Sequence, residues 1–188
     1  MKKIVLSVLL VTALFGSLYD VKAATSKEAK LNAYRLAIPG KDWALEIAVS
    51  TQYSSVKQFE TAGSFYLQNQ KTGVSIMARL EKAAGEGDAI AARDYYTKKT
   101  SMGGLQAEDI KQYEFGDAAV REYIIRDSRF RALSGDVVVV KNLNYYLSHD
   151  GYWAEIQISK LNYLPSDKNL FDEILANVKI VPLEKGSL

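Results

Sequence analysis

One hairpin near the C-terminus constrains the fold of this chain more than any other stretch of its 188 residues. The segment 143–159 has Asp150-Gly151 at its middle, a dipeptide that accepts positive φ angles and favours a two-residue turn. After the turn, residue types alternate with a period of two, as they do in a strand whose faces meet different surroundings. One face carries Tyr152, Ala154, Ile156 and Ile158, and the other carries Trp153, Glu155, Gln157 and Ser159. The pattern predicts an antiparallel hairpin.

A helix is expected to cover this hairpin. After Pro165-Ser166-Asp167, apolar residues recur at helical spacing, and a last short strand follows. The apolar positions are Leu170, Phe171, Ile174, Leu175 and Val178.

The preceding chain contains three more predicted hairpins and a second helix. The hairpins span residues 34–49, 65–81 and 110–126, each interrupted by a turn sequence, and the strand at 137–140 leads into the terminal hairpin. Asp88 is placed to cap a helix that runs to about Thr100, with an inward stripe of Ala91, Ala92, Tyr95 and Tyr96. We therefore predict an α+β fold, an antiparallel sheet built from hairpins and flanked by helices.

The N-terminal residues are typical of a bacterial Sec-type signal peptide. Two lysines precede a mostly apolar run, and Val21-Lys22-Ala23 offers small residues before a cut at Ala24. The run is shorter than the roughly 20 residues that span a bilayer, although an uncleaved anchor is the alternative. We expect residues 1–23 to be the signal peptide, 24–33 a mobile N-terminus and 34–188 a single domain. The expected address is the periplasm or the medium.

Charge and cysteine content exclude several classes of function. The chain has 24 basic and 22 acidic residues, and residues 1–23 hold three and one of them, which leaves 21 of each. A neutral domain has no overall attraction for nucleic acid, so a nucleic-acid partner is not expected. There is no cysteine and only one histidine, so disulfides, thiol chemistry and the usual zinc ligand sets are not expected. No cofactor and no metal are predicted, and no membrane span after signal cleavage.

The order of elements resembles the PsbP-like family. The resemblance rests on Tyr34-Arg-Leu-Ala-Ile-Pro39 followed by Trp43, on Tyr145-Tyr146 and Ile156-Gln-Ile-Ser159, and on the closing run from Phe171 to Ile180. This family includes extrinsic photosystem II subunits, bacterial periplasmic proteins such as DcrB and a eukaryotic Ran-binding nuclear-transport factor. The resemblance implies an α/β/α arrangement and, in most members, binding or assembly without catalysis. It supplies no catalytic motif.

Two sets of residues could in principle carry catalysis. Ser148, His149 and Asp150 are consecutive in a predicted turn, where neighbouring side chains diverge, so a serine relay is not expected. The strand carboxylates Glu46, Glu81, Glu122 and Glu155 could supply a glycosidase pair, but each alternates with apolar residues as solvent-facing strand positions do. We predict that the protein is not an enzyme.

Two surface features are candidate partner-binding sites. The arginines Arg121, Arg126, Arg129 and Arg131 could bind an acidic partner, although Glu122 and Asp127 among them favour a self-neutralised surface. Tyr146 and Trp153 form an exposed aromatic patch if no helix covers them, and belong to the core if one does.

The sequence therefore favours a secreted or periplasmic, non-catalytic domain that binds an envelope protein or assists assembly of an envelope complex. A small-ligand or carbohydrate-binding domain is the alternative, and an aromatic-lined cleft would favour it. An immunity or effector-chaperone role is a variant of the first hypothesis. A carboxylate hydrolase is the least favoured hypothesis.

Overall fold

The computed structural model describes residues 30–56, 63–99, 106–131 and 137–183, with the side chains of 127–131 also outside the description. Its strands are β1 (Leu31–Ala37), β2 (Trp43–Ser50), β3 (Ser54–Ser55), β4 (Ser64–Asn69), β5 (Val74–Lys82), β6 (Ala107–Phe115), β7 (Ala118–Arg131), β8 (Val137–His149), β9 (Tyr152–Leu161) and β10 (Val178–Pro182). The helices are α1 (Ala89–Lys99) and α2 (Lys168–Leu175), with a short 3-10 turn, η2 (Pro165–Asp167), before α2.

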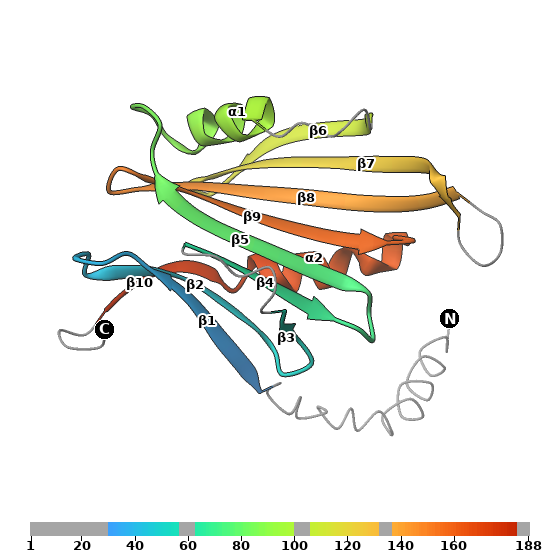
Figure 1. Ribbon diagram of the computed structural model, residues 1–188, viewed down its shortest axis with the longest axis horizontal. Coiled ribbons are helices and arrows are strands. Elements are labelled where there is room, and N and C mark those ends of the chain that lie inside the picture. The colour runs from blue at the N-terminus through green and yellow to red at the C-terminus, as the bar shows by residue number, and fades with distance from the viewer. Residues whose placement is uncertain (1–29, 57–62, 100–105, 132–136, 184–188) are drawn as a thin grey trace, which may run out of the picture.

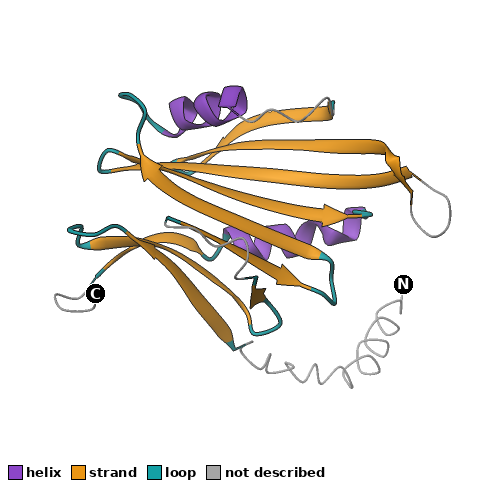
Figure 2. Cartoon of the chain, viewed as in Figure 1, coloured by secondary structure: helices purple, strands orange, loops and turns teal. Residues whose placement is uncertain are grey.

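These strands form two antiparallel sheets. The larger sheet has the order β3-β4-β5-β9-β8-β7-β6, and the smaller has the order β1-β2-β10. Helix α1 lies against one face of the large sheet, and α2 and the small sheet lie on the other side (Figures 1 and 2). The predicted α+β architecture, an antiparallel sheet flanked by helices, is confirmed.

The Asp150-Gly151 turn forms as predicted. Asp150 has φ 48° and Gly151 has φ 76°, and His149 pairs directly with Tyr152 across the two-residue loop. Successive positive φ angles match the right-handed twist of the flanking strands, and Asp and Gly tolerate them best. The turn therefore fixes the register of two central neighbours in the large sheet, β8 and β9.

This register gives the large sheet two different faces. Ala154, Ile156 and Ile158 belong to the main core, which also holds side chains of α2 and of the small sheet. Trp153 points the other way, into a smaller core with Tyr146 and residues of α1. The alternation predicted for β9 is thus confirmed, and both faces are covered near the turn.

Helix α1 begins where the sequence predicts it. The Asp88 side chain accepts hydrogen bonds from the backbone N–H groups of Ile90 (2.9 Å) and Ala91 (3.1 Å), as an N-cap residue does. Ala92 and Tyr96 are buried and Tyr95 is partly buried against the same core, which confirms the predicted inward stripe.

Helix α2 covers the opposite face. Phe171, Ile174 and Leu175 are buried in the main core, and Leu170 packs against it. Val178, the last position of the predicted helical stripe, instead begins β10, because the helix ends at Leu175.

The two ends of the described domain pair with each other, which the sequence did not predict. Strand β10 pairs with β2, placing Ile180 opposite Leu45, so the first hairpin and the last strand form their own sheet. Alternation along a strand shows which residues share a face, but it does not show which strand lies alongside.

The first strand begins three residues before the predicted one, which started at Tyr34. Strand β1 begins at Leu31, and the backbone of 31–33 pairs with the end of β2. The side chains at these positions are exposed, so their pattern gave no strand signal. The predicted signal peptide (1–23) and residues 24–29 lie outside the described residues. None of the helices described is long and apolar enough to span a bilayer.

An ion triad crosses the small sheet. Glu46 in β2 accepts a hydrogen bond from Arg35 in β1 (2.7 Å) and is paired with Lys179 in β10 (3.2 Å). The hydrogen bond from Arg35, with help from Lys179, holds the pKa of Glu46 below its ordinary value of 4.5. The carboxylate thus joins all three strands.

Gly63 is predicted to tolerate a side chain less well than Gly40. It has φ +80°, and a Cβ there would lie 2.8 Å from the backbone oxygen of Leu80. Gly40 has φ +82° but open space around it, so it is the matched control. Gly40→Ala should cost about 1–2 kcal/mol, the usual cost of a left-handed L-residue, and Gly63→Ala should cost more. Urea unfolding of both variants measures the difference; equal losses would contradict the close approach of Gly63 to β5.

The triad predicts a specific acid response. Because the pKa of Glu46 is lowered on folding, its stabilisation is present above pH 4.5 and is lost as pH falls through the folded-state pKa. Glu46→Gln should therefore lower stability at pH 7 and flatten the loss between about pH 5 and pH 3. Glu86→Gln, which removes an exposed acid before α1, is the control. Unfolding free energies measured across this pH range test the prediction. If Glu46→Gln loses stability between about pH 5 and pH 3 as steeply as the wild type, the triad does not contribute as described.

Candidate functional site

Polar side chains form a layer between α1 and the large sheet. Glu155 in β9 is 1% exposed and is paired with Arg79 of the adjacent strand β5. Its other oxygen accepts a hydrogen bond from Asn144 Nδ2 at 2.7 Å. The guanidinium of Arg79 lies 4.2 Å from the centre of the Tyr96 ring, so the pair is enclosed by the helix. We call Arg79, Asn144 and Glu155 the polar layer.

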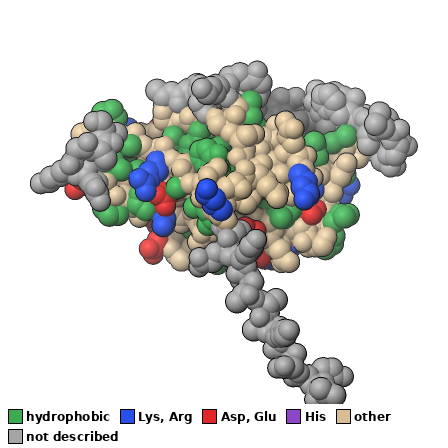
Figure 3. Space-filling model, turned by 90° about the horizontal axis from the view of Figure 1, so that it is seen from below, with side chains coloured by type: hydrophobic (Ala, Val, Ile, Leu, Met, Phe, Trp, Pro, Cys, Tyr) green, Lys and Arg blue, Asp and Glu red, His purple; other side chains and the backbone are tan. Residues whose placement is uncertain are grey.

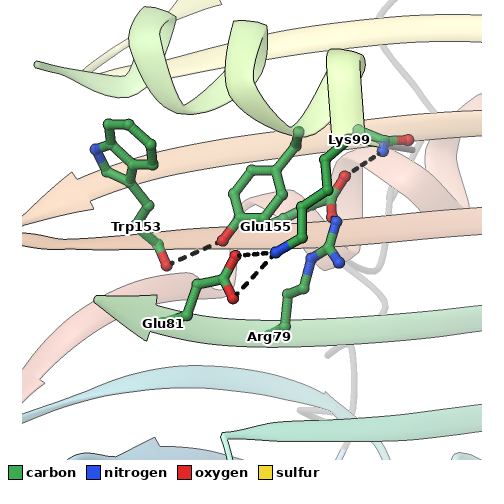
Figure 4. Close-up of polar contacts among 7 residues, drawn as sticks. Arg79, Glu81, Lys99, Trp153 and Glu155 are labelled. Carbon is green, nitrogen blue, oxygen red and sulfur yellow. Dashed lines mark hydrogen bonds and ion pairs between the residues drawn. The ribbon is translucent and has the colours of Figure 1, made fainter. Parts of the chain in front are cut away.

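Figure 4 shows how the end of α1 closes over this layer. Arg79 and Glu81 project from β5 toward the helix, and Lys99 Nζ reaches Glu81 at 3.2 Å. The Tyr96 hydroxyl donates to the Trp153 carbonyl at 3.5 Å. Burial raises the pKa of Tyr96, so its hydroxyl remains a neutral donor.

Tyr146 and Trp153 are core residues, not an exposed patch. They are 1% and 4% exposed, and Tyr96 of α1 stacks on Tyr146 with ring centres 5.9 Å apart. Helix α1 covers the end of the sheet where both rings lie. The core alternative is correct, and neither ring offers a surface to a partner.

The arginine cluster is divided by the structure. Arg126 donates to Glu108 at 2.8 Å, so that part of the surface is self-neutralised, as the neighbouring acids suggested. Arg121 points to the α1 side of the sheet and is 8% exposed. Arg129 and Arg131 belong to β7, but their side chains lie outside the described residues. The four arginines are therefore not shown to form one site.

The four strand carboxylates are held by cations. Glu46 and Glu155 are 5% and 1% exposed, which corrects the prediction that these positions face solvent. Their partners are Arg35 and Lys179 for Glu46, Lys99 for Glu81, Lys141 for Glu122, and Arg79 for Glu155. A glycosidase acid needs a raised pKa. Burial would raise the pKa of Glu122, but hydrogen bonds from Lys141 and Tyr113 hold it below its usual value.

His149 lies at the exposed end of the terminal hairpin. Its ring meets Trp43 edge-on, with centres 4.8 Å apart. Asp150 binds Lys41 (2.6 Å) and Trp43 Nε1 (3.3 Å), so these contacts occupy the acid that a relay would need. His149 is exposed beside the turn, as predicted, but it is the last residue of β8, and its cluster joins the small sheet to the large one.

An open cleft of about 530 Å³ lies beside the N-terminus of α1. Its lining residues are Gly87, Asp88, Ala89, Ile90, Glu114, Gly116, Asp117, Ala118 and Ser148, with no aromatic ring among them. An aromatic-lined cleft was the feature that would have favoured a carbohydrate-binding domain. Within the described residues, no group of three or more His, Asp or Glu side chains is arranged to hold a metal ion.

The outermost strand of the large sheet exposes apolar side chains. Strand β6 is exposed along almost its whole length and ends the strand order. Ile110, Tyr113 and Phe115 are 51%, 39% and 55% exposed, and they are three of the six large apolar side chains exposed in the described chain. A bulge between Glu108 and Lys111, with Asp109 at φ 51°, interrupts the pairing of β6 with β7. Bulges of this kind limit indiscriminate pairing at a sheet edge.

Two solved structures share this arrangement. The solution structure of a cyanobacterial PsbP (CyanoP) from Synechocystis matches with a TM-score of 0.52 and 15% identity, over 89% of this chain and 99% of that one. The yeast (Saccharomyces cerevisiae) Ran-binding protein Mog1p matches with a TM-score of 0.51 and 12% identity, over 83% and 98%. The fold is PsbP-like.

The likeness is one of fold. At these identities the match confirms the PsbP-like fold that the sequence suggested, while membership of the family stays a prediction. No family model matches the chain, and no curated protein matches its sequence.

The Arg79–Glu155 pair was not predicted from the sequence. A signal for it was present, because Glu155 alternates with Trp153 on one face. A helix that covers Trp153 also buries Glu155, and a buried carboxylate requires a cation.

Removing Arg79 should be strongly destabilising. Arg79→Met leaves the Glu155 carboxylate buried without its cation, which typically costs about 3–5 kcal/mol. The double variant Arg79→Met with Glu155→Gln removes both charges and should recover a large part of the loss. Urea unfolding of the two single variants and the double variant gives the coupling energy. Additive losses would show that the two side chains do not interact.

Proposed function

We propose that this protein is a non-catalytic, secreted or periplasmic domain that binds a protein partner through its β6 edge and assists assembly of an envelope complex. The observation that carries the proposal is the concentration of exposed apolar side chains on β6. Monomeric proteins rarely gather large apolar side chains on one exposed element without a binding role.

The charges on the face seen in Figure 3 are consistent with a polypeptide partner. On the face seen in Figure 3, described acidic and basic side chains lie interspersed, not gathered into one patch of a single sign. Nucleic acids and anionic membranes select strongly basic surfaces. A protein partner needs no such field, because apolar anchors and backbone hydrogen bonds at a sheet edge supply the affinity.

The fold comparison is consistent with this role. Mog1p is a Ran-binding protein, so the same fold supports protein binding in at least one structural neighbour. The secreted or periplasmic location rests on residues 1–23, whose lysines, apolar run and Val21-Lys22-Ala23 fit a signal peptide. An immunity or effector-chaperone role would use the same edge with a different partner.

The test is affinity capture of the tagged protein from its own cell envelope, with crosslinking and mass spectrometry. A single dominant protein partner is expected. Phe115→Ser and Ile110→Ser should each reduce its recovery at least tenfold, because each removes an exposed apolar anchor from β6. Leu164→Ser is the matched control, because Leu164 is 60% exposed but lies outside β6. Equal recovery with all three variants would refute the β6 site, and recovery of no partner would refute the protein-binding function.

A further inference from the structure

Arg121 occupies the middle of the polar face of the large sheet. It lies in β7 between Gln112 of β6 and Asn144 of β8. Two residues earlier on the same face, Ala119 packs in the core beneath α1. Arg121 therefore points to the side of the sheet that carries the polar layer, next to the helix.

Arg121 is buried, and its Nε has no hydrogen-bond acceptor in the described chain. It is 8% exposed, and its Nε is buried without a hydrogen-bond acceptor. In the described chain, its guanidinium makes a cation–π contact with Tyr123, whose ring centre lies 4.6 Å from the guanidinium carbon. A buried guanidinium N–H normally has an acceptor beside it, because a buried donor without one is costly.

The described acids on this face do not neutralise Arg121. Glu155 is already paired with Arg79 and Asn144. Glu114 is on the adjacent strand β6, opposite Ala119, but it forms no ion pair with Arg121. Among the described residues, the polar face thus has one cation, Arg121, and one acid, Glu114, that no ion pair uses.

Asn144 adds an unused acceptor beside this cation. It is the direct register partner of Arg121, so the two Cβ atoms are about 5 Å apart. Its Nδ2 is used by Glu155, but its Oδ1 is buried without a donor. Within the described chain, one buried donor without an acceptor, Arg121 Nε, and one buried acceptor without a donor, Asn144 Oδ1, therefore belong to register partners on adjacent strands.

We propose that Arg121 and Asn144 form a binding site for a carboxylate whose neighbouring group offers an N–H or O–H. The planar guanidinium matches a carboxylate with two parallel hydrogen bonds, and Asn144 Oδ1 accepts from the neighbouring donor. A carboxylate with a single negative charge fits this site better than a phosphate dianion. Arg121 supplies only one positive charge, and the acids Glu155 and Glu114 lie on the same face of the sheet. Either a free small acid or an acidic side chain of a protein supplies this chemistry.

The direct test observes the arginine side chains by NMR. Acetate is titrated into the purified protein at constant ionic strength, with chloride as the exchanged anion. The Nε–Hε signal of Arg121, assigned through its loss in Arg121→Met, should shift and saturate. The signal of Arg126, which is exposed and paired with Glu108, is the internal control. An Arg121 signal that moves no more than that of Arg126 would overturn the proposal.

Stability provides a second readout that separates binding from structure. Without ligand, Arg121→Met removes a buried donor that has no acceptor and should raise the melting temperature by about 2–4 °C. The same variant should lose the stabilisation that acetate gives the wild type. Arg121→Lys keeps the charge without the fork and should retain a weaker response. A melting temperature that falls in Arg121→Met, with the acetate effect intact, would assign Arg121 a purely structural role.

A pair of blocked amino acids distinguishes the two sources of the carboxylate. N-acetyl-glutamate N-methylamide presents an acidic side chain beside amide N–H groups, and the glutamine analogue is its neutral control. Binding at least tenfold tighter than acetate would assign the site to an acidic protein segment, and equal binding would assign it to a free small acid. Failure of both acids to bind would sink this site but leave the β6 proposal standing, since that rests on a different surface.

Discussion

The register of the β8–β9 hairpin is the constraint on which the rest of this structure depends. Asp150 and Gly151 adopt the two positive φ angles that a two-residue turn requires, and they set His149 opposite Tyr152. Because side chains alternate with a period of two, this register decides which residues lie on each face of the central strands. The apolar face meets α2 and the small sheet, and the polar and aromatic face meets α1.

The same constraint explains where charge is buried. Trp153 and Glu155 are two residues apart on β9, so a helix that covers the ring also encloses the carboxylate. Arg79 neutralises Glu155 from the neighbouring strand, while Arg121 on the far side of Asn144 has no equivalent partner among the described residues. An ion pair thus neutralises Glu155 at one end of the polar face, whereas the buried Nε of Arg121 has no acceptor among the described residues at the other.

Local features of the sequence predicted most turns, helices and strands. Which strands pair across the chain could not be predicted in the same way. The Asp150-Gly151 turn and the Asp88 cap depend on a few adjacent residues, so their predictions are confirmed. The pairing of β10 with β2 joins segments at opposite ends of the domain and could not be inferred from alternation. The surroundings of Arg121 depend on its register partners, Gln112 on β6 and Asn144 on β8. The residues next to Arg121 in the sequence therefore suggested only a cluster of surface charges.

The most direct test of the hairpin register is a nuclear Overhauser experiment between α1 and β8, with labelled aromatic rings and leucine methyl groups. The structure places the Tyr96 ring 5.9 Å from the Tyr146 ring and turns Leu147 toward the main core. Cross-peaks between Tyr96 and Tyr146 are therefore expected. Cross-peaks from Tyr96 to the Leu147 methyl groups instead would mean that the strand faces the other way, and would contradict the assignment of both Glu155 and Arg121 to the face beneath α1.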